Sequence, residues 1–489
     1  MGAVACAAVD STPSCPVQTT VHQCLFPLWT VKVSDFLNMS GPPEPHHVLQ
    51  QKGLLHQWYP GMFVIFVSHQ WLSSCHPDPE GEQVWRLQKT LHGMIDGSLQ
   101  VMEDIISMSV DKNLSLDARQ HIADGFIFFD WFAIPQITAR THGINEEATK
   151  SDAALAVQSI PAYVELSNIF IALVSELSHK DSGDLVNYST WLSRGWCRAE
   201  LWCRLLSNKA DTSVIVVYSA REAEFMFPLD WQHNTIVEGN FTVESDRAAV
   251  VKLGEMAVES KLQHLREKGP LSHFRFYLAL HPKLLGQPRT QRDLQGFLKH
   301  FRFESLQQAV ADTSSMNAVM CAVFSGDVDI LRQLVAHRAN VNHSVQGLGD
   351  LGYYDTQTAL MAACKSQQDP SLVAAMIDLR ADANAQARTG VTPLFVARSP
   401  GQVKVLLEKK ADMQRHFALN GIASLASTET ALALLESRCD PTDIGEAKYG
   451  PLHALALYSR SNRYAVETAK LQRSISPILR AELTECPCN

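Results

Sequence analysis

The C-terminal third of the chain is organised by one stretch, Gly326-Asp327-Val328-Asp329-Ile330-Leu331-Arg332-Gln333-Leu334-Val335, which runs on into Ala339-Asn340-Val341-Asn342. Its apolar residues recur at the spacing of an amphipathic helix, and a loop of small and polar residues follows. The loop returns as Ala381-Asp382-Ala383-Asn384 and as Ala411-Asp412-Met413, at intervals of 42 and 30 residues. Repetition with a period of this size predicts a stack of helical units.

The first residues of the predicted helices repeat as well. The pattern Thr-Pro-Leu-His-x-Ala is followed by Thr392-Pro393-Leu394-Phe395-Val396-Ala397 and, less fully, by Gly450-Pro451-Leu452-His453. Loop, helix opener and period together resemble ankyrin repeats, with an unrelated array of helical hairpins as the alternative. The resemblance implies an all-α array of four to five degenerate units at residues 313–489, with a C-terminal cap. Such an array binds a protein partner through its concave loops and inner helices.

One segment inside the array imitates a nucleotide-binding motif. Gly347-Leu348-Gly349-Asp350-Leu351-Gly352 has the spacing Gly-x-Gly-x-x-Gly, whose glycines bind a dinucleotide only after a strand and at the start of a helix. That context is missing, and the segment lies in the longer interval between two repeat loops. We therefore expect an enlarged loop there.

The N-terminal half has a different pattern. From about residue 60, short apolar, β-branched and aromatic runs alternate with amphipathic or polar stretches, which is typical of an α/β fold with a parallel sheet. Residues 25–36 are expected to pack on this sheet as an added strand or helix. The expected strands are 61–67, 126–129, 168–174 and 213–218, and the expected helices are 83–95, 153–166, interrupted at Pro161, and 191–206.

Polar side chains gather where these strands end. In open parallel sheets, ligands bind beyond the carboxyl ends of the strands, so we predict a site there. Two simpler interpretations stay open, because Asp130 could cap a loop and His69 could be a hydrogen-bonded core histidine. The residues at the strand ends are Ser68, His69, Gln70, Asp130, Ser175 and Glu176.

A sequence motif follows the third expected strand. Trp196-Cys197-Arg198-Ala199-Glu200-Leu201 resembles the Trp-Cys-x-x-Glu-Leu motif of plant-type TIR (Toll/interleukin receptor) domains. The stretch from Phe128 to Gln136 is similar to the Trp-Ile-Asp-x-x-Cys-Ile-Asn-Gln stretch of fungal HET (heterokaryon incompatibility) domains, which are remote TIR relatives. The resemblance covers residues 60–220 and implies a flavodoxin-like parallel sheet. Two segments depart from the TIR pattern, 71–124 by its length and 131–151 by its sequence.

The TIR resemblance implies an activity. Catalytically active TIR domains are NAD glycohydrolases, and their catalytic glutamate matches Glu200. NAD would be a substrate, so no bound cofactor is expected. Breaking the bond between nicotinamide and ribose builds an oxocarbenium-like cation, which a carboxylate can stabilise. The substrate-binding residues implied by this interpretation are Ser68, His69, Asp130, Trp131 and Trp196, and the indole of Trp196 would flank the sugar.

Other interpretations of the same motif remain open. Glu200 stands four residues before Arg204, the favourable spacing for a helical ion pair, and Trp196 could be core packing. Many TIR domains are adaptors that self-associate without catalysis. The alternative function is therefore a non-catalytic scaffold.

Composition excludes several classes of protein. With 46% hydrophobic residues and a net charge of −9, the 489-residue chain is neither globally disordered nor an evident nucleic-acid binder, and the basic stretch 299–302 is too short to change this. The longest apolar runs, 62–67 and 169–174, are far short of the roughly 18 residues of a membrane span. The 11 scattered cysteines form no Cys-x-x-Cys pair, and no secretory signal is evident, which predicts reduced thiols in a cytoplasmic protein.

Two enzyme classes lack their motifs. No Gly-x4-Gly-Lys-Ser/Thr loop is present for an NTPase, and no His-Glu-x-x-His or close Cys/His cluster predicts a metal site. We expect an N-terminal extension at 1–55, a TIR/HET-like α/β domain at 56–235, a helical connector at 236–312 and the array at 313–489. Our hypothesis is an intracellular signalling protein whose array binds a partner and thereby brings the TIR-like domains together.

Overall fold

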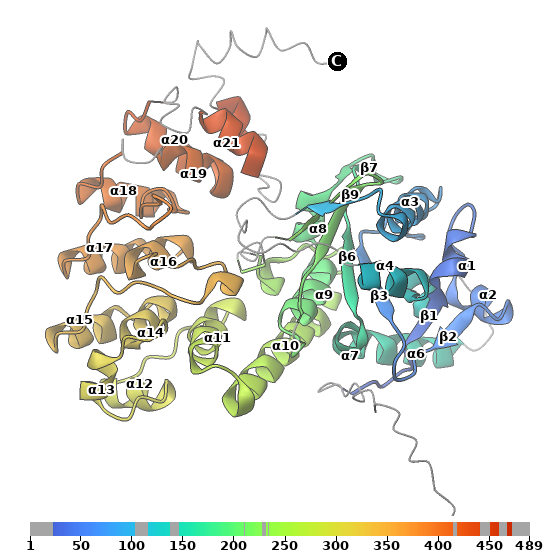
Figure 1. Ribbon diagram of the computed structural model, residues 1–489, viewed down its shortest axis with the longest axis horizontal. Helices are drawn as coiled ribbons and strands as arrows, with labels where there is room; N and C mark the ends of the chain where they lie inside the picture. Colours follow the sequence, from blue (N-terminus) through green and yellow to red (C-terminus); the bar gives the residue numbers. More distant parts are fainter. Residues whose placement is uncertain are drawn as a thin grey trace, which may run out of the picture.

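The computed structural model describes residues 23–102, 116–136, 146–209, 211–226, 231–232, 234–413, 418–440, 450–458 and 467–471. The N-terminal part is a sheet flanked by helices, and the C-terminal part is a column of paired helices (Figure 1). Two long helices, α10 (Asp246–Lys268) and α11 (Leu271–Leu284), lie between the two parts.

The sheet is mixed, with a parallel centre. Within the described residues it has eight strands in the order β2-β1-β5-β3-β6-β9-β10-β4. Strands β5, β3, β6 and β9 are parallel neighbours, whereas β1 and β10 pair antiparallel with β5 and β9. The strands are β1 (Trp29–Lys32), β2 (Leu55–Gln57), β3 (Val64–His69), β4 (Val101–Met102), β5 (Phe126–Phe129), β6 (Ile169–Leu173), β9 (Ile215–Ser219) and β10 (Glu222–Phe225), with a separate hairpin of β7 (Leu177–Ser178) and β8 (Leu185–Val186).

The predicted parallel strands are confirmed as β3, β5, β6 and β9. All six residues of β3 are buried, as its continuous apolar run indicates for a strand covered on both faces. The N-terminal segment also joins the sheet, because Val31 of β1 pairs with Ile127 of β5. Strand β2 crosses the boundary expected at residue 55, so the segment before it and the α/β domain share one sheet.

The helices of this part surround the sheet, and α9 faces the array (Figure 1). The predicted interruption before Pro161 is confirmed, since α6 ends at Gln158 and Pro161 stands in the first turn of α7. The helices are α1 (Val33–Leu37), α2 (His46–Gln51), α3 (Glu82–Asp96), α4 (Leu116–Ala123), α5 (Asp130–Ala133), α6 (Glu146–Gln158), α7 (Ile160–Leu166), α8 (Tyr188–Ser193) and α9 (Gly195–Leu205), followed by the short 3-10 helix η1 (Ile236–Glu238).

The single helix predicted for 191–206 is wrong, because α8 and α9 are separate. They meet at Arg194, whose backbone is extended and forms a β-bridge with Asn240. A Cβ atom on the following Gly195 would lie 2.0 Å from Cζ of Phe241. The break between the helices therefore lets the segment around Asn240 pack against the first residues of α9.

Aromatic rings connect the sheet to the array through α11. Trp202 of α9 lies 5.7 Å from Trp231 between ring centroids, and Trp231 stacks on Tyr277 of α11 at 6.3 Å. The neighbouring Phe276 contacts Phe324, in the first helix of the array, at 5.0 Å. The apolar core is consequently continuous from the sheet to the array.

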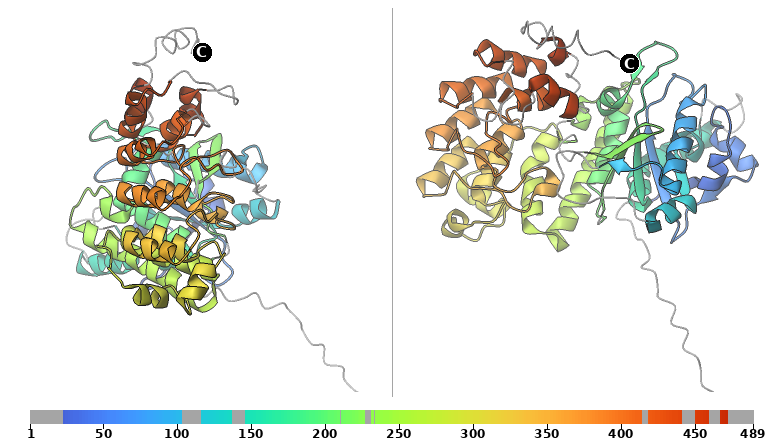
Figure 2. Two further views of the ribbon diagram at one scale, coloured as in Figure 1. Left: turned by 90° about the vertical axis from the view of Figure 1, so that its left-hand side faces the viewer. Right: turned by 45° about the horizontal axis from the view of Figure 1, so that its top comes forward.

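The array is a stack of helices, which faces the viewer in the left-hand view of Figure 2. Two short helices, α12 (Leu294–His300) and α13 (Leu306–Ala311), precede it. Its helices are α14 (Ala318–Ser325), α15 (Val328–Ala336), α16 (Ala359–Lys365), α17 (Pro370–Asp378), α18 (Pro400–Glu408), α19 (Ala418–Leu425), α20 (Thr428–Glu436) and α21 (Pro451–Tyr458).

The repeat loops have one structure in successive units. Asn342 Nδ2 donates to the Arg380 carbonyl oxygen at 3.0 Å, and Asn342 Oδ1 accepts from the Asp382 amide at 2.9 Å. One unit later, Asn384 makes the same two bonds to Lys410 and Asp412. A residue with a left-handed backbone stands before each loop, at Arg338, Arg380, Lys410 and Arg438. The predicted repetition is confirmed at the level of single hydrogen bonds.

Two intervals depart from the repeat. The segment 347–352 is a loop with one 3-10 turn, η2 (Gly349–Leu351), so the prediction of an enlarged loop is confirmed. The loop contacts the connector, because Asp350 Oδ2 lies 2.9 Å from His273 Nε2. In the short third unit, the predicted opener 392–397 forms only turns. The next helix, α18, already begins at Pro400 with Ser399 as its N-cap, so little chain is left after the opener.

Candidate functional site

Ser68 connects the carboxyl end of β3 to the two helices that follow β6. Its hydroxyl donates to Glu200 Oε2 of α9 at 2.5 Å and accepts from Trp191 Nε1 of α8 at 3.1 Å. Ser68 and Trp191 are buried, whereas Glu200 is partly exposed. The Glu200 carboxyl is therefore held from inside the fold by Ser68.

The surroundings of Glu200 favour its neutral form. Burial raises the pKa of Glu200 to about 8, the Ser68 hydrogen bond opposes this rise, and the Asp130 charge adds to it. At neutral pH the carboxyl is mostly protonated. A neutral carboxyl can hold a hydroxyl group of a ligand, and an approaching cation would favour its ionisation.

The simple ion-pair interpretation of Glu200 is wrong. Arg204, four residues later, is buried, and its guanidinium donates to the carbonyl oxygens of Ser167, Asn168 and Ser213 at 3.1–3.3 Å. These carbonyls lie around the start of β6 and β9, away from the strand ends where Glu200 meets Ser68. Arg204 therefore anchors α9 to the sheet.

His69 and Asp130 form a second polar pair at the same strand ends. His69 Nε2 lies 2.8 Å from Asp130 Oδ1, and the imidazole stacks on Phe129 with 3.9 Å between centroids. Asp130 Oδ2 accepts from Trp71 Nε1 at 2.9 Å. His69 Nδ1 faces the carbonyl oxygen of Gln70 at 3.3 Å, so both ring nitrogens face acceptors. This geometry favours the protonated imidazole.

The pKa values of the pair move in opposite directions. Burial lowers the pKa of His69, but the charge and hydrogen bond of Asp130 outweigh burial, and the pKa is raised. Burial raises the pKa of Asp130, but the charge and hydrogen bond of His69 outweigh it, and the pKa is lowered. His69 is thus a hydrogen-bonded core histidine, and Asp130, the first residue of α5, is its counter-ion.

The two tryptophans expected to bind substrate point elsewhere. Trp131 is buried, and its Nε1 donates to the Pro43 carbonyl oxygen at 2.9 Å. Trp196 Nε1 donates to Asp246 Oδ2 at the start of α10, 3.2 Å away. Trp131 is therefore a core residue hydrogen-bonded to the loop at Pro43, and Trp196 links α9 to α10.

Sequence reasoning missed two contributors to this site. Trp191 was assigned only to a helix, yet its indole holds Ser68. Thr190 Oγ1 donates to Gln70 Oε1 at 2.8 Å and so joins α8 to the loop after β3. Neither contact has a sequence spacing that would reveal it, since 123 and 120 residues separate the partners. Of the remaining strand-end residues, Ser175 is buried and Glu176 is exposed.

Among the residues that the structure describes, no three His, Cys, Asp or Glu side chains are grouped as a metal ion would need. In those same parts of the chain, no helix combines the length and apolar character that crossing a membrane requires.

The loops of the array form a second candidate site, for a macromolecule. Along them, buried Ala339, Ala381 and Ala411 alternate with exposed Asn340 and Asp382. Residues 319–417 match the family description "Ankyrin repeats (3 copies)". A comparison of the chain with curated proteins finds no match.

The ankyrin match covers the first part of the array predicted for residues 313–489, and the units and cap predicted after residue 417 stay a prediction. Ankyrin repeats bury their helices against neighbouring units and leave their loops to partners, which indicates a role in protein–protein interaction. The hydrogen bonds of Asn342 and Asn384 fix the loops relative to one another. The exposed polar groups between them form a surface with a fixed spacing.

Proposed function

We propose that this is a signalling protein in which the ankyrin repeats bind a protein partner and a TIR-like N-terminal domain self-associates and hydrolyses NAD to nicotinamide and ADP-ribose. One observation carries the proposal. The Glu200 carboxyl, at the glutamate position of the Trp-Cys-x-x-Glu-Leu motif, is hydrogen-bonded to Ser68 at a strand end, beside the pair of His69 and Asp130.

The order of the parallel strands supports the TIR-like assignment. Numbered along the chain, β3, β5, β6 and β9 are the first to fourth parallel strands, and they stand in the order second, first, third, fourth. This corresponds to the start of the flavodoxin-like order, in which ligands bind where the first and third strands adjoin. Ser68 and His69 end the first of these strands, beside β6.

The chemistry uses the unusual protonation of Glu200. The nicotinamide ring of NAD is cationic, and a cation beside a carboxyl group favours the ionised form, so bound NAD lowers the raised pKa. The carboxylate then stabilises the positive charge on the ribose as the C–N bond breaks and its electron pair leaves with nicotinamide. Water adds to the ribose carbon, and its proton passes to Glu200 or to solvent.

The array supplies the control of this activity. A partner that binds two arrays raises the local concentration of the N-terminal domains, which favours their self-association. Proximity then completes the NAD site or recruits further signalling proteins. If dilute protein without partner is fully active, this proximity step is wrong.

The test uses the full-length protein, because the core is continuous across its parts. Nicotinamide release from NAD is measured with protein in dilute solution and with protein crowded on beads. Release is expected to rise on the beads and to fall by about a hundredfold or more in Glu200→Gln, the scale of losing one transition-state-stabilising group. Glu267→Gln, at an exposed glutamate near the end of α10, is the matched control.

The second candidate function is a non-catalytic scaffold. It is favoured by the positions of two tryptophans that the enzyme interpretation assigns to substrate binding. The indole N–H groups of Trp131 and Trp196 donate to Pro43 and Asp246 within the fold. A scaffold of this kind self-associates without consuming NAD. Folded protein that releases no nicotinamide in either format would establish the scaffold in place of the enzyme.

A further inference from the structure

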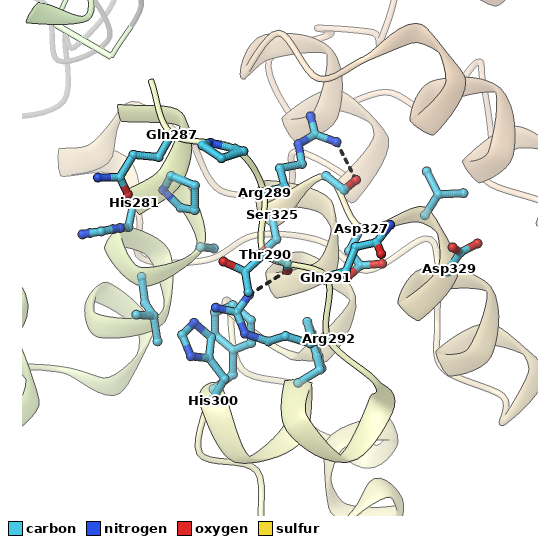
Figure 3. A pocket seen from close by; sticks show the side chains of 18 of the residues that line it. His281, Gln287, Arg289, Thr290, Gln291, Arg292, His300, Ser325, Asp327 and Asp329 are labelled. Carbon is cyan, nitrogen blue, oxygen red and sulfur yellow. Dashed lines mark hydrogen bonds between the residues drawn. The ribbon is translucent and has the colours of Figure 1, made fainter. Parts of the chain in front are cut away.

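Outside the Glu200 site, a groove of about 850 Å³ lies where the helical connector meets the first ankyrin unit (Figure 3). Its apolar residues Leu262 and Phe297 are buried. Its carboxylate and guanidinium groups are Glu259, Asp327, Asp329, Arg266, Arg289 and Arg292, and Arg289 also interacts with Asp369. Because these charges balance, the groove favours no particular class of ligand.

The strand ends near Glu200 are followed by two segments that contact each other. Residues 72–82 follow β3, and the β7–β8 hairpin, residues 177–186, follows β6. Strands β3 and β6 are neighbours, and β7 stands at the upper end of the sheet in Figure 1. We call residues 72–82 the first flap and residues 177–186 the second flap. Both lie at the edge of the sheet where ligands of parallel α/β folds bind.

Both flaps are close in the chain to the Ser68–Glu200 hydrogen bond. The first flap begins four residues after Ser68. The second flap is followed directly by Asn187, whose side chain caps α8 by accepting from the Thr190 amide at 3.1 Å. In the same helix, Trp191 donates to Ser68, which in turn donates to Glu200. A movement of either flap therefore acts beside the candidate catalytic residue.

The flaps share a small apolar cluster of their own. Leu72 of the first flap packs with Leu177 and Val186 of the second, and these three residues are separate from the core that the sheet shares with the array. The Lys180 amide also donates to the Leu72 carbonyl oxygen at 2.6 Å. Because the cluster is separate, the flaps can part without opening the main core.

Polar groups hold the flaps together at their rim. Lys180 Nζ lies 2.7 Å from Glu80 Oε2 and 3.0 Å from Glu82 Oε2. Beside it, Asp181 Oδ2 accepts from the Ser74 amide at 2.7 Å. Each of these contacts joins the first flap to the second. The ion pairs are partly exposed, so dissolved salt weakens them.

The closed arrangement leaves polar atoms unpaired. Asp78 Oδ1 in the first flap, Gln83 Oε1 just after it and Ser175 Oγ just before the second flap are buried, and within the described residues they have no hydrogen-bond partner. Asp78 is 0% exposed. A buried polar atom without a partner costs free energy, which is regained when the atom meets water or a ligand. The contacts of Lys180 thus hold closed an arrangement that these atoms destabilise.

We propose that the two flaps form a lid, held closed by Lys180, that opens to admit NAD to the strand ends. The admission of NAD rests on the function proposed above, whereas the opening of the lid does not. In the closed state the ion pairs of Lys180 and the cluster around Leu72 are intact. In the open state Lys180 leaves Glu80 and Glu82, and the buried Ser175 becomes accessible.

The first test measures opening without NAD. Ser175→Cys places a thiol at a buried position of the full-length protein, and its reaction with N-ethylmaleimide is followed by mass spectrometry of tryptic peptides. Residues 151–194 contain no native cysteine, so alkylation there reports the new thiol alone. Added Lys180→Ala is expected to speed the reaction about fivefold or more, because two ion pairs are lost. Added Lys268→Ala, at an exposed lysine at the end of α10, is expected to leave the rate unchanged.

Charge reversal separates the ion pairs from other effects of substitution. Lys180→Glu is expected to speed alkylation, and adding Glu80→Lys and Glu82→Lys is expected to slow it again. In the protein that retains Ser175, amide exchange at Leu177 and Val186 should follow the same order, which checks that the thiol has not opened the lid. Alkylation and exchange that are equal with and without Lys180→Ala would overturn the proposal.

The second test asks whether the lid controls NAD. If binding needs the open state, the apparent affinity is reduced by the fraction of protein that is open. Lys180→Ala is therefore expected to lower the KM of nicotinamide release by the factor that alkylation gains, with kcat unchanged. An active enzyme with faster alkylation and the same KM would overturn the gating of NAD. Faster alkylation without nicotinamide release from any variant would refute the NAD reaction and leave the lid in place.

Discussion

The Glu200 carboxyl and the Ser68 hydroxyl share a 2.5 Å hydrogen bond that joins helix α9 to the carboxyl end of strand β3. The same hydroxyl accepts from Trp191, so strand, α8 and α9 meet at one oxygen atom. Structure and protonation are linked at this point, because the groups that fix α9 also determine the charge of the candidate catalytic residue.

Glu200→Gln is expected to change how stability depends on pH. The folded-state pKa of Glu200, about 8, lies above its ordinary value of 4.5, so the folded protein holds the proton over this range and loses stability as pH rises. The variant has no such loss. The difference in melting temperature, variant minus wild type, should therefore increase as pH rises from 4.5 to about 8. A loss of a few kcal/mol of unfolding free energy in wild type corresponds to a shift of about 5 °C. Parallel melting profiles would contradict the raised pKa.

The same titration should appear in the activity. The proposed reaction needs the carboxylate, and kcat/KM reports the ionisation of the free enzyme. We expect kcat/KM for nicotinamide release to rise with pH and to level off near pH 8, the pKa of Glu200. Initial rates at low NAD concentration across this range provide the measurement. A rate that falls with rising pH would exclude Glu200 as the ionising group.

Ser68→Ala is expected to destabilise the fold by about 1–3 kcal/mol, because it leaves the buried Trp191 indole without an acceptor and Glu200 without a donor. Trp191→Phe removes only one of the two bonds. Urea denaturation of both single variants and the double variant gives their coupling energy. Additive effects would mean that the bond between them contributes nothing to stability.

The His69 and Asp130 pair should stabilise the protein most between their ordinary pKa values, 3.8 for Asp130 and 6.5 for His69. The raised pKa of His69 gives stability that is complete below 6.5 and is lost as pH rises through the folded-state value. The lowered pKa of Asp130 gives stability that is complete above 3.8 and is lost as pH falls through its folded-state value. The difference in unfolding free energy between wild type and His69→Gln, measured against pH, should have its maximum in this window. A flat difference would mean that His69 is neutral in the folded protein.

Arg275→Met tests the junction before the first repeat. Arg275 is buried, pairs with Asp312 at 2.9 Å, donates to the Phe301 carbonyl oxygen at 2.8 Å and lies over the Phe303 ring. Losing one partner of such a pair leaves Asp312 uncompensated and is expected to cost about 3–5 kcal/mol. In the variant, amide hydrogen exchange should become faster than in wild type in α12 and α13, and should change less in the sheet. Lysine at this position should not restore protection, since it cannot reproduce the planar contacts.

The sequence predicted the parallel strands and the repeat loops because both depend on local patterns. The buried run 64–67 and the loop residues Asn342 and Asn384 each carry their own signal of period or composition. The break at Arg194 was missed, because it depends on a bridge to Asn240 in a later segment. The helix expected at the Thr392 opener does not form, since 392–397 makes only turns before α18 begins at Pro400.

The candidate site was predicted in part. Ser68, His69, Asp130 and Glu200 do gather at one end of the sheet, since the carboxyl ends of parallel strands adjoin. The direction of a tryptophan side chain follows no such rule. Trp196 turns to Asp246 because α10 packs on α9, and nothing near residue 196 in the sequence indicates that contact.

Aromatic contacts run from Trp202 through Trp231 to Tyr277, and the neighbouring Phe276 continues them to the repeats. A flexible tether would transmit only nearness from a bound partner, since its two ends rotate freely. Here the repeats and the sheet share one apolar core, so we expect them to turn together. A partner that gathers two copies of this chain would therefore dictate the angle at which their sheets face each other as well as the distance between them.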